Sequence, residues 1–376
     1  MTKKTKIFAY YLPQFHTIPE NDSVWGKGFT EWTNVKKAKK LFKEHYQPRV
    51  PLDKNYYTLT DKNKIYWQMD LAKNHGVDGF AIYHYWYNGK KLLEKPLEII
   101  RDNSELDLPI MIIWANHDWN NGWSAEGKIQ TLYTVDYSDK NDWKLHFEYL
   151  LSFFKLPNYL KENNQPMLGI YEPDKIPNLN ELISYWNELA IEQGFNGIKF
   201  SYQAISKFKA DGQSRDKFKY QIEYQPQYAW KKLDSSSKKS NLIGILKKIP
   251  SMKSILKKYV KIRPNSLVKK RRYEEVAQEI VSMREKDDKS IAGFYVGWDN
   301  TPRKKSRGTV DVGSTPAVFQ KFLINQLENI SSNYSNQYLF LFAWNEWAEG
   351  GYLEPDEKYG YQYLEAIKKA REITGK

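Results

Sequence analysis

Two glutamates near the C-terminus are the residues whose type and spacing most clearly suggest chemistry. Glu346 and Glu349 lie three residues apart in the stretch FLFAWNEWAEGGYLEP, beside Trp344 and Trp347. Aromatic neighbours desolvate a carboxyl group and favour its protonated form, while a second carboxyl group can stay ionised. Such a pair supplies the acid and the base that cleavage of a glycosidic bond requires. The alternative is that both glutamates cap the following turn or form ion pairs with Arg or Lys.

The elements that must position these glutamates are strands that alternate with helices. Eight apolar, β-branched or aromatic runs are typical of buried strands: 6–15, 77–86, 109–118, 166–173, 198–204, 219–226, 291–299 and 338–346. Helix-like stretches lie between most of them: 61–75, 89–104, 139–154, 178–193 and 272–286. This alternation predicts an α/β protein in which residues 1–376 form a single (β/α)8 barrel, that is, a TIM barrel.

Polar and aromatic residues stand at the C-terminal ends of the predicted strands. They include His16, His84, Trp86, Asn116, His117, Glu223, Asp299, Asn345 and Glu346. In barrels of this class that face carries the active site, so the pattern predicts a ligand pocket there. Taken singly, each residue could instead be a strand-end group whose hydrogen bonds the chain itself satisfies.

Aromatic residues make up 15% of the chain, a composition that suits flat, amphipathic ligands such as sugars. The candidates for contact with a sugar are Tyr11, Trp32, Trp86, Trp119, Trp298, Trp344 and Trp347, with Asn116, Asn345, Glu223 and Asp299 as polar anchors. The alternative is that the tryptophans face the helices and belong to the core.

The composition also restricts the cofactors. The chain has no cysteine, which excludes a disulfide, a thiolate metal site and a Cys nucleophile. Three of its six histidines, His16, His84 and His117, lie at predicted strand ends, but no His-x-x-x-His or carboxylate spacing supports a metal site. We therefore predict no metal and no cofactor.

The positive charge is concentrated in one segment. Residues 231–272 contain fifteen Lys and Arg against one Asp, so this segment carries a charge of +14. The whole chain carries +13, so the charges of the remaining residues sum to −1. A nearly neutral body argues against a nucleic-acid partner. The spacing of apolar residues over 242–262 predicts a basic amphipathic helical insertion after the sixth strand, which would bind an anionic membrane surface through 242–272 or simply lie in solvent against the barrel.

The N-terminal residues run from a polar stretch directly into a predicted strand, without the apolar run of a signal peptide. No segment approaches the length of about 20 apolar residues that a membrane span needs. We therefore expect a cytoplasmic protein, with the basic insertion as a means of peripheral attachment to the inner membrane.

Seven stretches resemble the WbsX-type family, whose members are labelled glycosyltransferases of surface-polysaccharide clusters. They are WGKGFTEWTNV (25–35), HYQPRVPLD (45–53), VDGFAIYHYWYNGKKLLEKP (77–96), WANHDW (114–119), GWDNTPR (297–303), GSTPAVF (313–319) and WNEWAEGGYLEPDEKYGYQYLEA (344–366). That family is similar in fold to family 99 glycoside hydrolases, which are endo-acting α-mannosidases and mannanases. The resemblance implies an oligosaccharide or polysaccharide substrate.

The resemblance also implies a mechanism. In family 99 enzymes one Glu takes the proton of the substrate 2-hydroxyl, giving a 1,2-anhydro sugar, and a second Glu three residues later protonates the leaving oxygen. Carried over by position, Glu346 is the base and Glu349 the acid. Relatives commonly read WANEN where this chain reads WANHD, so His117 stands where a carboxylate is expected. That change alters sugar recognition or catalysis, or is a neutral swap within a hydrogen-bond network.

Two other classes of function stay open. A nucleotide-sugar glycosyltransferase is what the family label implies, but no Gly-x-Gly-x-x-Gly, P-loop or Asp-x-Asp motif is visible. A barrel could still transfer glycosyl groups between glycans or use a lipid-linked donor. A catalytically silent glycan-binding protein would use Glu346 and Glu349 only as hydrogen-bond acceptors.

Overall fold

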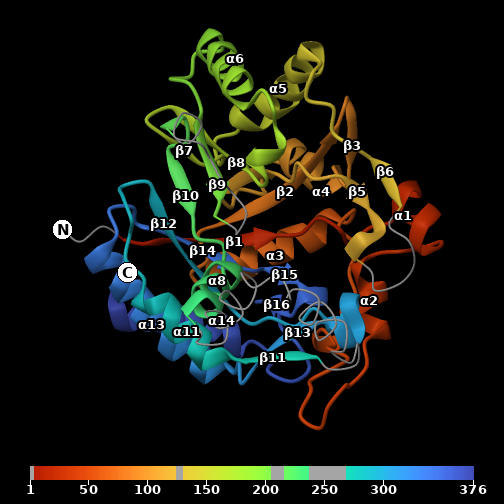
Figure 1. The fold of residues 1–376 in the computed structure, drawn as a ribbon, viewed down its shortest axis with the longest axis vertical. Helices are drawn as coiled ribbons and strands as arrows, with labels where there is room; N and C mark the ends of the chain where they lie inside the picture. The colour runs from red at the N-terminus through yellow and green to blue at the C-terminus, as the bar shows by residue number, and fades with distance from the viewer. Residues whose placement is uncertain (1–3, 124–129, 205–215, 237–267) are drawn as a thin grey trace, which may run out of the picture.

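The computed structural model describes residues 4–123, 130–204, 216–236 and 268–376. Its centre is a closed barrel of eight parallel strands (Figure 1). In order around the barrel these are β1 (Lys6–Tyr11), β2 (Gly79–Tyr87), β4 (Ile110–Trp114), β8 (Gln165–Ile170), β9 (Lys199–Gln203), β10 (Tyr220–Ile222), β12 (Ser290–Tyr295) and β14 (Tyr338–Phe342). The last strand pairs with the first, with Lys6 opposite Tyr338, and this closes the barrel. Each strand overlaps a predicted run, so the predicted barrel is confirmed.

Helices surround the barrel. They are α3 (Lys62–Asn74), α4 (Lys95–Asp102), α5 (Lys140–Phe154), α6 (Leu179–Glu192), α8 (Gln227–Ser236), α11 (Tyr273–Ser282), α13 (Pro316–Asn333) and α14 (Gln362–Thr374). In Figure 1, α5 and α6 lie on one side of the barrel, and α11, α13 and α14 lie on the opposite side. Residues 205–215, between β9 and β10, are outside the described residues.

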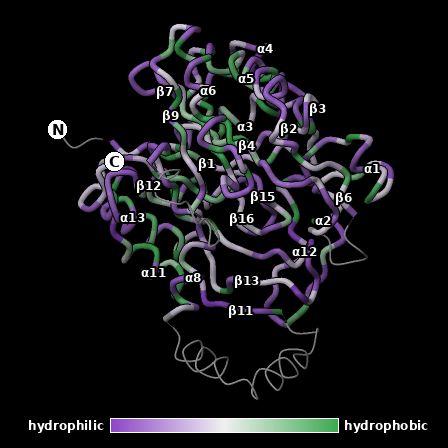
Figure 2. The backbone as a smooth tube through the Cα atoms, turned by 45° about the horizontal axis from the view of Figure 1, so that its top comes forward, coloured by the Kyte–Doolittle hydropathy of each residue, from purple (hydrophilic) through white to green (hydrophobic). Residues whose placement is uncertain are grey.

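Several strands are continuous apolar runs because both of their faces are covered. The sequences IMIIW of β4 and YLFLF of β14 are buried at every position. One face meets the barrel interior and the other meets the helices, so neither needs polar residues. The hydrophobic stretches of Figure 2 accordingly fall in strands and helices.

Side-chain caps mark where several helices begin. Asp61 accepts a hydrogen bond from the amide of Asn63 at the start of α3, and Asp139 does the same for Asn141 at the start of α5. Thr315 caps α13 through the amide of Val318. These contacts satisfy amide groups that have no partner within the helix.

Six of the eight predicted strands run three or more residues past the end of the observed strand. The last barrel strand ends at Phe342, and Glu346 belongs to a separate short strand, β15 (Asn345–Glu346), which pairs antiparallel with β16 (Gly351–Tyr352). His16 and Asp299 likewise lie in the loops beyond β1 and β12. Apolar and aromatic residues continue past each strand end because the loops above the barrel are also buried.

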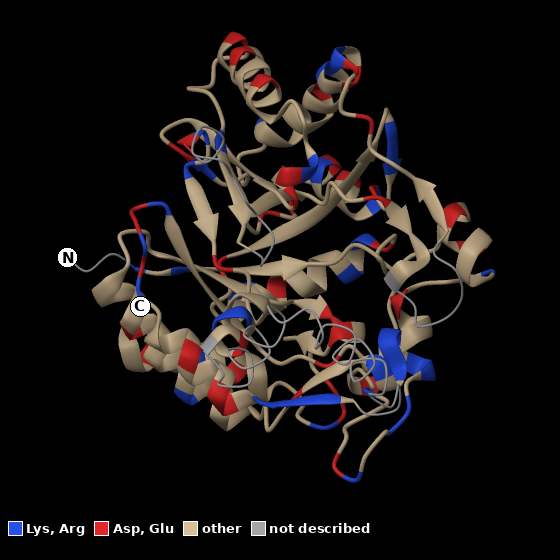
Figure 3. Cartoon of the chain, viewed as in Figure 1, with Lys and Arg blue, Asp and Glu red and all other residues tan. Residues whose placement is uncertain are grey.

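The predicted basic insertion follows β10, but residues 237–267, with the predicted amphipathic stretch 242–262, lie outside the described residues. The described ends of the insertion are α8 and β11 (Lys269–Arg272). This second end is a strand paired with β13 (Thr309–Val312), not a continuation of a helix. Figure 3 shows β11 as a basic strand at the edge of the molecule. Within the described ranges no helix is both long and apolar enough to cross a membrane.

Candidate active site

Glu346 and Glu349 face the same cavity. Glu346 ends β15, and Glu349 ends the 3-10 turn η5 (Trp347–Glu349), so their spacing of three places both side chains on one side of the turn. Gly350 follows with φ of 69°, in the left-handed region, and a Cβ there would lie 2.7 Å from the amide nitrogen of Asp299. Glycine is therefore required for the chain to turn directly after the pair.

Arg303 contacts both glutamates and a third one. Its Nη1 lies 2.7 Å from Oε1 of Glu349, and its Nη2 lies 3.2 Å from Oε2 of Glu346. Nη2 also lies 3.1 Å from Oε2 of Glu31. Arg303 comes from α12 (Thr301–Lys304) and Glu31 from the start of α2 (Glu31–Lys37), so three distant segments meet at one guanidinium.

This cluster is buried and holds more carboxyl groups than cations. Burial raises the pKa of Glu346 and of Glu349, and the positive charge of Arg303 opposes that rise in both. Each of the two pKa values is raised further by neighbouring carboxylates, Glu31 among them. Three carboxylates around one guanidinium would leave an excess negative charge, so the cluster favours holding a proton near neutral pH. One protonated and one ionised carboxyl group is the state that acid and base catalysis needs.

Tyrosines form much of the wall around the carboxylates. The cavity has a volume of about 220 Å³. Its lining residues are Leu12, Gln14, Tyr83, Tyr85, Ala115, His117, Tyr171, Tyr224, Asn300, Arg303, Lys304, Glu346 and Glu349. The hydroxyl groups of Tyr83 and Tyr224 form a hydrogen bond at 3.2 Å. Because the volume is below the ~300 Å³ at which pockets for drug-sized ligands begin, it suits a single ring with hydroxyl groups.

His117 is the predicted binding residue that does line this cavity. Its ring lies near those of Tyr85 and Tyr171, with centroid distances of 6.1 and 5.7 Å. Burial lowers the pKa of His117 to about 4, so the ring is neutral at pH 7. A neutral imidazole therefore lines the same cavity as the two glutamates, at the position where the family resemblance implies a carboxylate.

Four other predicted binding residues point away from the cavity because adjacent residues of a strand face opposite sides. His84 and Trp86 contact α5 through His146 (3.0 Å between Nε2 atoms) and Asp142 (3.0 Å from the indole nitrogen). The residues preceding them in β2, Tyr83 and Tyr85, line the cavity.

Tyr11 and Glu223 are the other two predicted binding residues that point away from the cavity. The hydroxyl of Tyr11 donates to Gln68 of α3, and the next residue, Leu12, faces the cavity. Glu223 accepts a hydrogen bond from the hydroxyl of Tyr334, and its neighbour Tyr224 faces the cavity.

Two predicted anchors, Asn116 and Asn345, instead tie loops together. Asn345 accepts from the amide of Leu12 at 2.7 Å and donates to the carbonyl of the same residue at 3.0 Å. Asn116 binds the amide and the carbonyl of Glu172 in the same manner, at 2.7 and 2.8 Å. Neither lines the cavity, but both hold together the loops that form its rim.

Four of the remaining predicted aromatic residues, Trp32, Trp119, Trp344 and Trp347, are core residues, as the alternative had it, and the fifth, Trp298, lines a separate cavity beside the first one. Trp32 donates to the carbonyl of Tyr57 at 2.8 Å, and Trp119 donates to Asn21 at 3.2 Å. Trp347 stacks on Tyr352 with ring centroids 3.8 Å apart. Trp344 is fully buried. His16 is also buried outside the cavity, and burial lowers its pKa to about 4.

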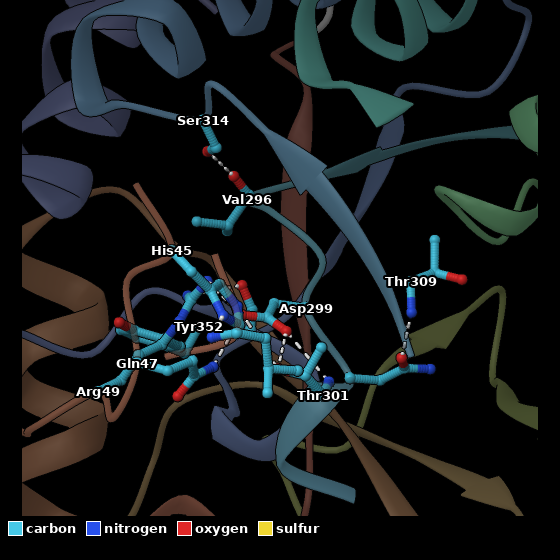
Figure 4. A network of polar contacts seen from close by, with 12 residues as sticks. His45, Gln47, Arg49, Val296, Asp299, Thr301, Thr309, Ser314 and Tyr352 are labelled. Carbon is cyan, nitrogen blue, oxygen red and sulfur yellow. Dashed lines mark hydrogen bonds and ion pairs between the residues drawn. The ribbon is translucent and has the colours of Figure 1, made fainter. Parts of the chain in front are cut away.

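Asp299 fixes the loop that carries Arg303. Its Oδ2 lies 2.8 Å from Nε2 of His45 and 2.8 Å from Nε2 of Gln47, and its Oδ1 accepts from the amide and hydroxyl of Thr301 (Figure 4). Burial would raise the pKa of Asp299, but these donors and the positive charge of Arg49 lower it overall. Asp299 thus anchors the residues immediately before α12 and is not a group of the cavity.

Sequence reasoning missed Glu31, Arg303 and the four tyrosines. Glu31 and Arg303 belong to the quoted stretches WGKGFTEWTNV and GWDNTPR, and they are 272 residues apart in the chain. The alternative that the glutamates form ion pairs with Arg or Lys is confirmed by Arg303, and both glutamates also line the cavity. In the parts of the chain that the structure describes, no group of three or more His, Asp or Glu is arranged to hold a metal ion.

Comparison with known proteins shows to which family the chain belongs. Residues 7–367 match the family described as Glycosyltransferase WbsX. The chain belongs to the WbsX family. Two relatives, each named uncharacterized protein WxcX, come from two strains of Xanthomonas campestris pv. campestris and are 29% identical to this chain over 372 residues. These matches cover 98% of this chain and 50% of each relative, so this WbsX chain spans about half the length of the curated relatives it matches.

Solved structures share the barrel of this WbsX chain. The GH99 endo-alpha-mannosidase from Bacteroides thetaiotaomicron superposes with a TM-score of 0.56 at 12% identity, over 98% of this chain and 97% of that one. A protein described as glycoside hydrolase-like gives the same TM-score at 10% identity, over 98% and 95%. At these identities the likeness shows a common fold.

Proposed function

We propose that this protein breaks or transfers glycosidic bonds of a surface polysaccharide, with Glu346 and Glu349 as the reacting groups. The observation that carries the proposal is that both carboxyl groups face one tyrosine-walled cavity and contact the same guanidinium. WbsX membership and the fold shared with a GH99 enzyme support a carbohydrate-active enzyme.

The roles of the two glutamates follow the family 99 resemblance. Glu346 takes the proton of the 2-hydroxyl of the sugar, whose oxygen attacks C1 while the bond to the leaving oxygen breaks and Glu349 protonates that oxygen. A hydroxyl of water, or of an acceptor glycan, then attacks C1 and opens the 1,2-anhydro ring. Glu349 takes the proton of this hydroxyl, and Glu346 returns its proton to the 2-oxygen. An α-mannoside has a 2-hydroxyl placed for this attack.

The second candidate is transfer from a nucleotide sugar, which the description of the family favours. In that case the leaving group is a diphosphate, and the lysine and arginine of the cavity, Lys304 and Arg303, are the cations nearest to it. A glycan-binding protein without activity is the third reading, and it would bind saccharides without turning them over.

One experiment separates these functions. The wild-type protein and the Glu346→Gln variant are incubated with α- and β-linked oligosaccharides and aryl glycosides, and in parallel with sugar nucleotides and acceptor glycans. Release or transfer of sugar without a nucleotide, lost in Glu346→Gln, is the expected result. Turnover only with a nucleotide sugar would reject the glycosidase-like mechanism, and binding without turnover would reject an enzyme.

We also propose a setting for the activity, on the charge of the sequence alone. The basic segment 242–272 would hold the protein on the anionic inner surface of the cytoplasmic membrane, at roughly 1 kcal/mol per Lys or Arg near the lipid. Sedimentation with anionic and neutral liposomes at physiological salt tests this. Binding that survives deletion of residues 235–270, or no binding at all, would contradict it.

A further inference from the structure

Glu31 is a buried carboxyl group for which the proposed reaction has no role. Its side chain is only 1% exposed, and it is not among the residues that line the cavity of Glu346 and Glu349. A carboxylate that has lost its water needs an ion pair or hydrogen bonds. Glu31 finds them on Arg303, the cation that also contacts the two glutamates of the cavity. Any effect of Glu31 on the cavity must therefore pass through Arg303 or through charge.

Glu31 binds one edge of the Arg303 guanidinium. Its Oε2 accepts from Nε at 3.2 Å and lies 3.1 Å from Nη2. The remaining nitrogen, Nη1, lies 2.7 Å from Oε1 of Glu349, and Nη2 also reaches Glu346 at 3.2 Å. Because a guanidinium is planar, a contact on the edge formed by Nε and Nη2 fixes the direction of Nη1. Glu31 therefore aims Arg303 at the two glutamates.

Glu31 itself is held in place by the start of α2. Its backbone amide donates to the carbonyl of Gln14, a residue of the cavity wall, at 3.1 Å. The next residue, Trp32, packs on Trp347 of η5 with ring centroids 5.4 Å apart. In Figure 2, α2 and α12 lie side by side, and both contact η5. The segments that carry Glu31, Arg303 and the two glutamates of the cavity thus form one packed unit.

The charges around the two glutamates do not balance without a proton. Two cations line the cavity, Arg303 and Lys304, whereas three carboxyl groups contact Arg303, namely Glu31, Glu346 and Glu349. Three carboxylates against two cations leave one negative charge, which a single proton removes. The other titratable residues of the cavity lining are neutral near pH 7, because burial raises the pKa values of the tyrosines and lowers that of the histidine; they are Tyr83, Tyr85, Tyr171, Tyr224 and His117.

Glu31 decides this balance. With Glu346 and Glu349 alone, two carboxylates would face two cations, and both can then be ionised at no net charge. A pair in which both groups are ionised contains no acid. In agreement with this count, the charge of Glu31 contributes to the raised pKa of each of the two glutamates.

We propose that Glu31 is a positioning residue: it aims Arg303 at Glu346 and Glu349 and supplies the negative charge that makes this pair keep one proton. The inference deepens the proposed function and rests on it, because the proton is the one that the proposed mechanism gives to the leaving oxygen. Glu31 does not line the cavity, so it acts through Arg303 and through its charge.

Titration of the glutamate carboxyl groups by 13C NMR tests this charge without any turnover. In wild type labelled at the Cδ atoms of Glu, with signals assigned through Glu346→Gln and Glu349→Gln, the pair is expected to hold one proton at pH 7. Glu31→Gln removes the charge but keeps the shape, and we expect the pKa values of the pair to fall by about one unit, since a like charge nearby disfavours ionisation. Glu31→Asp keeps the charge and should titrate close to wild type.

Glu274→Gln is the matched control. Glu274 also lies in the first turn of a helix, α11, and pairs with Arg272 at 3.3 Å, but it is exposed and does not line the small cavity. This change should leave the titration of the pair as in wild type. Thermal melting shows whether each variant is folded, and the wild-type titration decides the matter even if Glu31→Gln does not fold.

On a saccharide substrate the same variants give a second readout. The acid must be protonated to act, so a lower pKa in Glu31→Gln is expected to move the alkaline limb of the kcat pH profile about one unit to lower pH. Glu31→Asp should restore the position of this limb. A merely structural role for Glu31 would lower kcat at every pH and leave the limb in place.

The outcomes separate this inference from the proposed reaction. Two ionised glutamates in wild type at pH 7, or a titration that Glu31→Gln leaves unchanged, would overturn the role of Glu31 even if the protein cleaves saccharides. An equal shift in Glu274→Gln would overturn it as well. A pair that loses its proton in Glu31→Gln and keeps it in Glu31→Asp supports this role even if no glycosidic bond is ever cleaved, and in that case the proposed function alone fails.

Discussion

Arg303 and Glu349 form a 2.7 Å ion pair within the cavity that Glu346 also lines. The same guanidinium reaches Glu346 at 3.2 Å, so one cation contacts both candidate catalytic groups. Its charge opposes the effect of burial, which by itself favours the protonated form of each glutamate. Arg303 therefore favours the ionised form of the glutamates, which is the form that can act as a base.

Replacing Arg303 with Gln is expected to move the acid limb of the kcat/KM pH profile to higher pH. Loss of the positive charge raises the pKa of Glu346 further, and a base must be ionised to act, so activity falls at a higher pH than in wild type. A nearby opposite charge is worth about one pKa unit or more, which sets the size of the shift.

Arg303→Lys is the matched variant. It keeps a positive charge but cannot bind two carboxylates with a planar fork, so we expect a smaller shift of the same sign. An acid limb that stays in place in Arg303→Gln would mean that Arg303 does not set the protonation of the glutamates.

His84 of β2 and His146 of α5 form a buried pair, and we expect both imidazole rings to stay neutral. Burial lowers the pKa of His84 to about 3 and that of His146 well below its ordinary value. Long-range 1H–15N NMR should therefore show neutral rings for both between pH 5 and pH 8, with the urea-unfolded protein as the control in which they titrate. Titration of either ring near pH 6.5 in the folded protein would contradict the packing of β2 against α5.

The Asp299 network is expected to stabilise the loop before α12. Asp299→Asn replaces a carboxylate oxygen with an NH2 group that faces donors from His45 and Gln47 or from Thr301. We expect a loss of about 2 kcal/mol in the free energy of unfolding, measured by urea denaturation. Asp70→Asn on the exposed face of α3 is the control and should change stability little. Equal stability of the two variants would show that the network contributes nothing.

The barrel could be predicted from the sequence because most of its strands lie within apolar or aromatic runs, with helical stretches between most of them. The two glutamates of the cavity could also be found, since Glu346 and Glu349 lie close together in one stretch. The sequence did not show which side chains of each strand point into the barrel and which point toward the helices. In β2 every position is buried, so no alternation of polar and apolar residues indicates that Tyr83 and Tyr85 face inward while His84 and Trp86 face the helices.

Contacts between loops that are distant in the chain could not be predicted from the sequence either. Glu31 and Arg303 meet only because the barrel brings the loops after β1 and β12 to the same face. Both residues read as surface charges in the sequence. A buried arginine with three acidic neighbours becomes visible only once the closed barrel is known.

The most direct test of the central claim compares Glu346→Gln and Glu349→Gln with the exposed control Glu365→Gln of α14 on one saccharide substrate. If the two cavity glutamates are the base and the acid, each of the first two variants should lose about 10²- to 10⁴-fold in kcat while keeping the wild-type melting temperature. Glu365→Gln should retain full activity. Activity within a few-fold of wild type in either Glu346→Gln or Glu349→Gln would contradict the account.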